Sequence, residues 1–358
     1  MFFHRDRPGS ARLAIRRQAW LRLVLGLVCM TLWPGLVGCG PMMFAVGVAP
    51  GDQRLEQTTV LSDGGFRNDR IAIVDISGMM LNAEQRGLLQ QGENPVSVLH
   101  EKLQKAAADP RVKAVVLRLN TPGGTVTATD AMYREVQRFR RETGKPVIAL
   151  MMDLATSGGY YVACASDHIV AYPTSITGSV GVLLQTVSFK PALERWGIEL
   201  EALTSGKNKT AGSMFETLTD EHREVLQRMV DDFYQGFVDV VRSARPTMDD
   251  ETFALVTDGR VFTGSDAAAL GLVDETGDLY DAFARAKSKV NLDRADLVIY
   301  HRPLRYAGSP YSPTTMAGPH EPPVDRTQIN LLQLNVAGLP GFADAPVGLY
   351  YLWRPDMQ

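Results

Sequence analysis

The chain has 358 residues, of which 45% are hydrophobic and 22% charged, and its formal net charge is −3. This composition suits a globular protein of one large or two small domains, and it argues against a nucleic-acid-binding protein because no basic patch follows the N-terminus. The three cysteines and six histidines form neither a disulfide framework nor a metal-ligand pattern, so we expect no metal and no cofactor.

A targeting segment is predicted over residues 1–38. Basic residues precede an apolar run that ends at Cys39, a pattern typical of a secretory signal, and the rest of the chain should lie on the extracytoplasmic side of the cell membrane. Residues 36–40 resemble a lipobox, in which Cys39 is lipidated and anchors the protein. The alternative is an uncleaved transmembrane helix over residues 23–49, although Pro34 and the glycines near Cys39 weaken a helix there.

A linker is predicted over residues 39–69, followed by one folded domain over residues 70–295. In this domain β-rich runs, at 71–78, 114–120 and 146–152, alternate with amphipathic helical patterns. Such alternation predicts an α/β fold with a largely parallel sheet.

A long helix is predicted to begin after Thr219, which can act as its N-cap. Its apolar stripe, Val225, Met229, Phe233 and Phe237, should face the core or another subunit. Residues 296–358 form a proline-rich tail that we expect to be partly disordered. The aromatic stretch 348–353 at its end is apolar enough to dock on the folded part.

Two glycine-rich turns follow predicted strands, at 120–124 and 155–161. A diglycine lets the backbone approach a ligand closely, and its N–H groups can stabilise an oxyanion. In the second turn Ser157 stands at a strand-to-helix junction, a favourable position for a nucleophile. The alternative is that Ser157 only caps the helix, and its neighbours do not match the GxSxG elbow.

A serine nucleophile needs a base. His168 would lie near the far end of a helix that begins at Ser157, about 15 Å away. Lysine is the other base used with serine, and it must lose its charge through burial or a neighbouring cation. Lys207 and Lys209 are the candidates, and side-chain chemistry alone does not choose between them.

Four motifs in order, at 120–124, 155–182, 205–227 and 258–277, resemble the signal peptide peptidase A family of serine peptidases. The resemblance covers about residues 70–290. It implies a Clp protease/crotonase-like fold of repeated ββα units, a Ser–Lys dyad, and a serine peptidase domain over residues 70–295.

The resemblance also assigns roles to individual residues. Ser157 matches the nucleophile and Lys209 matches the general base. Lys207 falls on a position that varies within the family. Gly124 matches a backbone donor of the oxyanion hole, and we expect the Gly158 N–H to be the second donor. Ser179 matches a serine that orients the lysine. Thr121, where the family usually has serine, is a modest departure.

The family relation further implies a ring-like homo-oligomer in which neighbouring subunits of short members share one site. Its expected substrates are leftover signal peptides and other exposed peptides. Two rivals stay open: a crotonase-type acyl-CoA enzyme and a non-catalytic membrane scaffold. The export signal and the Ser–Lys pairing argue against the crotonase.

Overall fold

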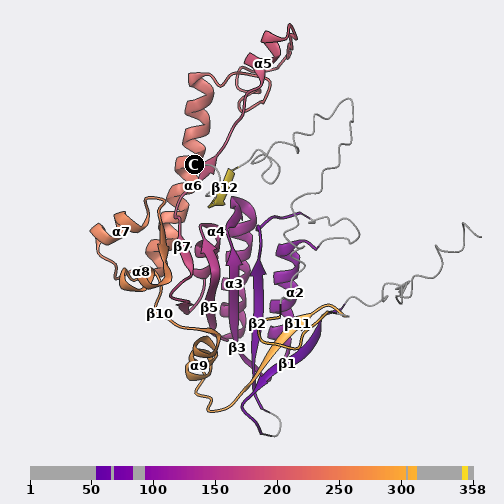
Figure 1. Ribbon diagram of the computed structural model, residues 1–358, viewed down its shortest axis with the longest axis vertical. Helices are drawn as coiled ribbons and strands as arrows, with labels where there is room; N and C mark the ends of the chain where they lie inside the picture. The colour runs from indigo at the N-terminus through magenta and orange to yellow at the C-terminus, as the bar shows by residue number, and fades with distance from the viewer. Residues whose placement is uncertain (1–53, 66–67, 84–92, 304, 313–348, 354–358) are drawn as a thin grey trace, which may run out of the picture. The chain divides into compact units, whose positions relative to one another are not determined.

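The computed structural model describes residues 54–65, 68–83, 93–303, 305–312 and 349–353 (Figure 1). All of them belong to one compact unit, Asp52–Gln358. The predicted targeting segment, Cys39 and most of the proline-rich tail lie outside the described residues. Among the helices that are described, none combines the length and the apolar character needed to cross a membrane.

The described core is a sheet with the strand order β1-β11-β2-β3-β5-β6-β10. The pairs from β11 to β10 are all parallel, and β1 closes the edge in antiparallel orientation. This confirms the predicted α/β class with a largely parallel sheet. The strands are β1 (Glu56–Ser62), β2 (Arg70–Ser77), β3 (Val112–Thr121), β5 (Val147–Thr156), β6 (His168–Ala171), β10 (Glu275–Thr276) and β11 (Asp296–His301).

Both faces of this sheet are covered, which explains why its strands are apolar almost throughout. In β2, Ala72 and Val74 belong to one buried cluster and Ile71 and Ile73 to the other. The first cluster includes side chains of α2 (Pro95–Ala108), α3 (Val126–Thr143) and α4 (Gly158–Ala163), whereas the second includes α9 (Leu279–Lys289) (Figure 1).

The remaining elements extend the sheet and cap its carboxyl end. Strand β7 lies parallel to β5 and antiparallel to β9, while β12 pairs with β4 and β8 in a second, three-stranded sheet. These elements are β4 (Gly123–Thr125), β7 (Ile176–Gly178), β8 (Leu183–Leu184), α5 (Lys190–Arg195), α6 (Asp220–Ala244), α7 (Asp250–Val256), β9 (Val261–Thr263), α8 (Gly264–Ala269) and β12 (Leu349–Leu352).

Helix α6 begins as predicted, and its apolar stripe is buried near one end of the helix and exposed near the other. The Thr219 side chain accepts a hydrogen bond from the His222 N–H. Near the far end of the helix, Phe237 is fully buried, whereas Met229 is 40% exposed. The first half of the stripe is therefore only partly covered in a single chain, where Val225 is half-buried and Met229 exposed.

Two stretches form strands in segments where the sequence predicted a linker and a tail. Residues 56–62 and 296–301 pair antiparallel with each other, and β11 also pairs with β2. The domain boundaries predicted at residues 69 and 295 therefore cut off two strands of the sheet. The sequence of β1 lacks a continuous apolar run, because an edge strand is only partly buried and carries polar residues.

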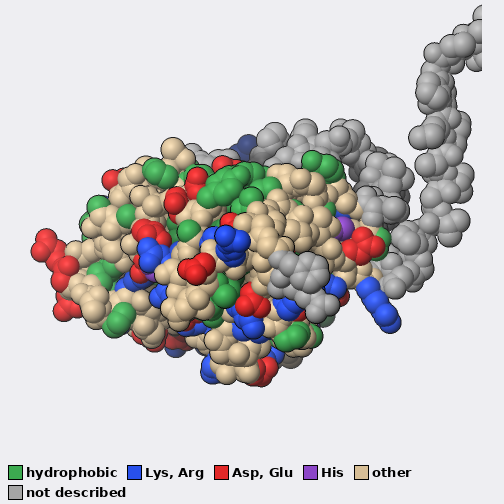
Figure 2. Space-filling model, turned by 90° about the horizontal axis from the view of Figure 1, so that it is seen from below, with side chains coloured by type: hydrophobic (Ala, Val, Ile, Leu, Met, Phe, Trp, Pro, Cys, Tyr) green, Lys and Arg blue, Asp and Glu red, His purple; other side chains and the backbone are tan. Residues whose placement is uncertain are grey.

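The face seen from below in Figure 2 carries acidic and basic side chains in alternation. That face consequently presents no broad field of one sign.

Candidate active site

Ser157 occupies a strained turn between β5 and α4. Its backbone has φ 52° and ψ −113°, a region that a non-glycine residue enters only at a cost of about 1–3 kcal/mol. The turn is fixed on both sides, because the Ser157 N–H donates to the Gly178 carbonyl at 2.7 Å and the Ser157 carbonyl accepts from the Tyr161 N–H at 2.9 Å. The fold thus holds this serine in one orientation.

The Ser157 hydroxyl is buried and has no hydrogen-bond partner in the described structure. It does not cap α4, since no side-chain bond reaches the helix N-terminus. The alternative role as a helix cap is therefore wrong. A buried hydroxyl without a partner costs about 1–3 kcal/mol and calls for an explanation such as a catalytic role.

The first glycine-rich turn lies directly beside this serine. A Cβ added to Gly124 would sit 1.9 Å from the Met80 carbonyl oxygen, and one added to Gly123 would lie 3.0 Å from the Gly158 nitrogen. Only glycine fits in such close backbone contacts. The turns that contain Gly124 and Gly158 therefore pack directly against each other.

The hydroxyl of Thr121 stabilises this first turn. Its Oγ1 accepts from the Gly123 N–H at 3.0 Å. A serine at this position would offer the same acceptor, so this departure from the family pattern leaves the turn intact.

Ser179 lies next to the nucleophile across the sheet. In the ladder between β5 and β7, Thr156 pairs with Gly178. Ser157 and Ser179 are the residues that directly follow this pair, so they begin at adjacent positions at the ends of the two strands. Ser179 also has a positive φ of 53°, and the only other non-glycine residue of the described chain with positive φ is Asn291. Two of the three described non-glycine residues with positive φ are therefore predicted site residues.

His168 is far from the nucleophile, as the sequence indicated. It pairs with Ile148 near the start of β5, whereas Ser157 follows the end of that strand, about 30 Å further along. Its Nε2 lies 3.0 Å from a carboxylate oxygen of Glu275. Within the described residues, no cluster of His, Cys, Asp or Glu could hold a metal ion.

Lys209 lies in an exposed turn eleven residues before the start of α6. The turn is attached to the first turn of that helix, because the His222 ring nitrogen Nε2 lies 2.9 Å from the Lys207 carbonyl oxygen. The Lys207 ammonium pairs with Glu221 at 2.6 Å, which gives this lysine a surface role.

The structure does not bring Lys209 to Ser157 within one chain. Phe237 of α6 packs against Tyr161, with ring centroids 5.0 Å apart, and Tyr161 is hydrogen-bonded to Ser157 through the backbone. His222, which holds the lysine turn, precedes Phe237 by fifteen residues, or about 22 Å along the helix. Most of the length of α6 therefore separates the two groups.

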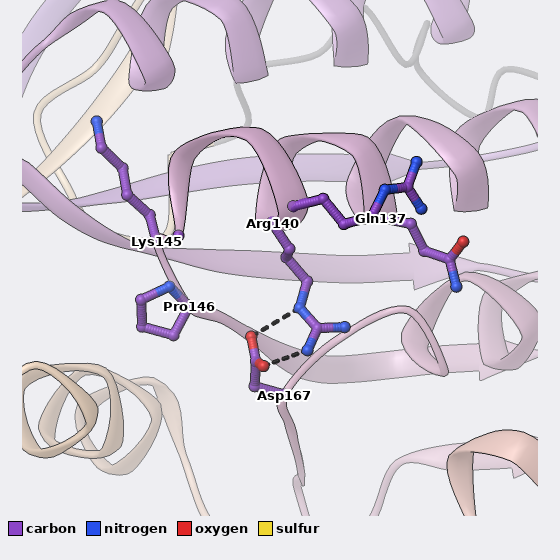
Figure 3. A pocket seen from close by; sticks show the side chains of 7 residues that line it. Gln137, Arg140, Lys145, Pro146 and Asp167 are labelled. Carbon is purple, nitrogen blue, oxygen red and sulfur yellow. Dashed lines mark hydrogen bonds and ion pairs between the residues drawn. The ribbon is translucent and has the colours of Figure 1, made fainter.

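A cavity lies elsewhere in the described structure and is not part of this site. It has a volume of about 360 Å³ and surrounds the Arg140–Asp167 ion pair, with Lys145 and Pro146 at its edge (Figure 3). Pro146 directly precedes β5, so the cavity lies at the amino end of that strand. Sites of parallel α/β sheets form at the carboxyl ends, where Ser157 stands.

Two residues at the site were missed by the sequence analysis. The Met80 N–H donates to the Gly123 carbonyl at 2.9 Å, and the Met80 carbonyl accepts from the Thr125 N–H at 3.0 Å. Thr129 has a buried hydroxyl without a partner in the described structure, and this oxygen would lie 2.7 Å from a Cβ on Gly158. Neither residue carries a sequence signal, because Met80 acts through its backbone and a threonine in a helix is common.

A strained, buried serine beside two glycine-rich turns is an arrangement that serine acyl-transfer hydrolases use. Comparison with known proteins agrees. Residues 139–293 match Peptidase family S49. The chain is 33% identical to a putative protease of Methanocaldococcus jannaschii, over 60% of this chain and 68% of that protein.

Two further relatives carry more specific names. Over 88% of this chain and 96% of the relative, identity is 26% to a putative signal peptide peptidase SppA of Enterococcus faecium. Identity is 32% to protease 4 of Salmonella typhi over 64% of this chain, which spans 36% of that longer protein. The chain belongs to peptidase family S49, and it is a serine peptidase of the signal peptide peptidase A type.

Proposed function

We propose that the protein is a membrane-anchored serine endopeptidase that degrades residual signal peptides and other exported or membrane-released peptides. The observation that carries the proposal is the buried, unpartnered hydroxyl of Ser157 between the turns of Gly124 and Gly158. The parallel sheet with this site at its carboxyl end supports a Clp protease/crotonase-like fold.

The proposed reaction is acyl transfer to Ser157. Lys209 in its neutral form takes the hydroxyl proton while Oγ attacks the peptide carbonyl. Backbone N–H groups of Gly124 and Gly158 hold the oxyanion, and one such donor contributes about 3–4 kcal/mol to transition-state stabilisation. Lys209 then protonates the leaving amine, and water hydrolyses the acyl-enzyme. Ser179 orients the lysine.

We infer that Lys209 comes from a neighbouring subunit of a ring-like homo-oligomer. The separation along α6 supports this inference, because within the described part of one chain the Ser157 hydroxyl has no hydrogen-bond partner that could act as a base. Large apolar side chains are also exposed around α5, where a neighbour would cover them. They are Trp196 (74% exposed), Ile198 (46%), Leu200 (50%) and Leu203 (93%).

Membrane attachment is proposed on the sequence of residues 1–39. We expect lipidated Cys39 to hold the catalytic domain on the extracytoplasmic side, with an N-terminal transmembrane helix as the other possible anchor. Cys39→Ser should release the protein from washed membranes if the anchor is lipid. Retention of this variant in the membrane fraction would favour the transmembrane helix.

The test of the peptidase proposal is acylation of Ser157 by a fluorophosphonate probe. Intact mass should show one adduct per chain in the wild type and none in Ser157→Ala. Ser166→Ala is the matched control, because Ser166 also has a buried hydroxyl without a partner in the described structure but lies after α4, away from the glycine turns. Labelling that persists in Ser157→Ala would refute the assigned nucleophile.

A further inference from the structure

Thr129 carries a buried hydroxyl that the proposed mechanism does not use. The residue is fully buried, and its Oγ1 has no hydrogen-bond partner within the described residues. A threonine in a helix can bond to the carbonyl four residues earlier, which here belongs to Thr125, but Oγ1 makes no such bond. Valine has nearly the same shape and would leave no polar atom unsatisfied, so the hydroxyl calls for an explanation.

This hydroxyl lies directly beside the proposed oxyanion donor Gly158. A Cβ added to Gly158 would lie 2.7 Å from Thr129 Oγ1, 2.7 Å from Met80 Cε and 3.2 Å from the Gly123 Cα. Of these three neighbours, only the threonine can donate a hydrogen bond. Any polar atom that enters this space therefore finds one side-chain donor.

The spacing allows Thr129 and Gly158 to bind the same oxygen atom. The Gly158 nitrogen and an added Cβ are bonded to one Cα, so they lie about 2.5 Å apart. Thr129 Oγ1 consequently lies no more than about 5 Å from that nitrogen. Two donors that each lie about 3 Å from one oxyanion can be up to about 6 Å apart, so a single oxygen can accept from both.

The chain also connects Thr129 to the other proposed donor. Gly124 is the middle residue of β4, which continues directly into α3, and Thr129 is the fourth residue of that helix. One short segment thus carries a backbone donor and a side-chain donor to the same site. Ser157 Oγ, like Thr129 Oγ1, is buried without a partner in the described structure, and a tetrahedral intermediate would give both hydroxyls a role.

We propose that Thr129 is a further catalytic residue, whose hydroxyl donates a third hydrogen bond to the oxyanion that forms when Ser157 Oγ adds to the peptide carbonyl. The inference rests on the proposed peptidase function and on the donors Gly124 and Gly158 assigned there. Hydrogen bonds to an ionised acceptor are roughly twice as strong as those to a neutral one. The hydroxyl therefore stabilises the transition state more than the bound substrate.

The first experiment compares Thr129→Val with Thr129→Ser in the full chain. A hydrogen bond to a charged oxygen is worth about 10- to 100-fold in rate, so kcat for a peptide substrate should fall by that factor in Thr129→Val, with little change in KM. Thr129→Ser keeps the hydroxyl and should retain most of the activity. Wild-type kcat in Thr129→Val, or an equal loss in both variants, would overturn the proposal.

Tyr300→Phe is the matched control. Tyr300 also has a buried hydroxyl without a partner in the part of the chain that is described, but it lies on β11, three strands away from β5. Tyr300→Phe and Thr129→Val each remove an unsatisfied hydroxyl at nearly constant shape, so neither should lower the melting temperature. Only Thr129→Val should lower kcat, and an equal loss in Tyr300→Phe would overturn the assignment.

The second experiment separates the transition state from the bound substrate and needs no turnover. A peptide aldehyde forms a tetrahedral adduct with Ser157, so its dissociation constant, measured by calorimetry, should rise about 10- to 100-fold in Thr129→Val. The parent peptide should bind Ser157→Ala with nearly the same affinity whether or not Thr129→Val is also present. An unchanged affinity for the aldehyde, or a matching loss of peptide binding, would contradict the proposed role.

The outcome in the wild type separates this inference from the peptidase function. A wild type that neither cleaves peptide nor reacts with a fluorophosphonate refutes the peptidase function, and the role of Thr129 falls with it. A wild type that does both, while Thr129→Val keeps its full kcat, refutes the role of Thr129 alone.

Discussion

Ser157 and Ser179 both have a positive φ, which serine rarely adopts. A positive φ costs a non-glycine residue roughly 1–2 kcal/mol, so a glycine at either position would relieve strain. That these positions nevertheless carry hydroxyl groups supports a chemical role for the side chains.

We therefore expect Ser179→Gly to raise the free energy of unfolding by roughly 0.5–1 kcal/mol while lowering kcat, because strain is relieved but the lysine loses its orienting hydroxyl. Asn291→Gly is the control. It removes the third positive φ outside the site and should leave kcat unchanged. Urea unfolding and peptidase assays measure the two effects. An unchanged kcat in Ser179→Gly would exclude the orienting role.

A buried lysine outside the site should govern stability at mildly alkaline pH. Burial lowers the pKa of the Lys102 ammonium to about 8, against the opposing attraction of Asp75. Between pH 8 and the ordinary lysine pKa of 10.5, the unfolded chain binds more protons than the folded chain, so the free energy of unfolding rises with pH. Below pH 8 both states are protonated, and the cost of the buried charge is fully present.

We predict that the free energy of unfolding of the wild type rises from pH 7.5 to pH 9 by roughly 1 kcal/mol more than that of Lys102→Met. Urea titrations at the two pH values measure this difference. Comparison with the variant cancels opposing contributions such as that of Cys164, whose buried thiol has its pKa raised to about 12. Parallel pH profiles would contradict the assignment to Lys102.

At the scale of elements, the glycine turn of β4 should tolerate no side chain. Gly124→Ala should lower kcat about a hundredfold or more, since the clash with the Met80 carbonyl displaces the oxyanion donor. Gly236→Ala is the matched control, because a Cβ there meets nothing within 4 Å, and in mid-helix it should stabilise the protein by about 0.5–1 kcal/mol. Wild-type kcat in Gly124→Ala would remove this turn from the mechanism.

Elements with a strong local pattern could be predicted from sequence. The runs at 71–78 and 114–120 are buried strands because helices cover both faces, and Thr219 caps α6 through its own side chain. Strand β1 could not be predicted, since it gains its structure from a partner that is distant in sequence. For β12, the apolar stretch 348–353 predicted docking on the folded part, but its strand pairing with β4 could not be predicted. The same holds for Met80, which supports the site only through its backbone.

At the scale of the molecule, the apolar surface around α5 should be a subunit contact. Leu203→Asp should reduce the assembly to smaller species and lower activity, because it places a charge in a contact that supplies Lys209. Tyr280→Asp, on α9 and 49% exposed, is the control and should change neither property. Light scattering coupled to size-exclusion chromatography measures the mass. An intact, active assembly of Leu203→Asp would rule out this contact.

The position of Lys209, the proposed base, is a question of how whole molecules assemble. The glycine turns, Ser157 and Ser179 could be placed together from motifs, because one chain folds them together. Lys209 was assigned by resemblance alone, and a single chain leaves it at the far end of α6. Its proposed role as the base therefore depends on the proposed oligomer.

The most direct test of a shared Ser–Lys site is complementation between two inactive proteins. Ser157→Ala and Lys209→Ala should each be inactive alone. The two proteins are mixed, and subunit exchange is confirmed by native mass spectrometry. If each site takes its serine and its lysine from neighbours, about a quarter of the sites in a random equal mixture are complete, and peptidase activity should return to about that fraction of wild type. Full exchange without any recovery of activity would contradict a site shared between subunits.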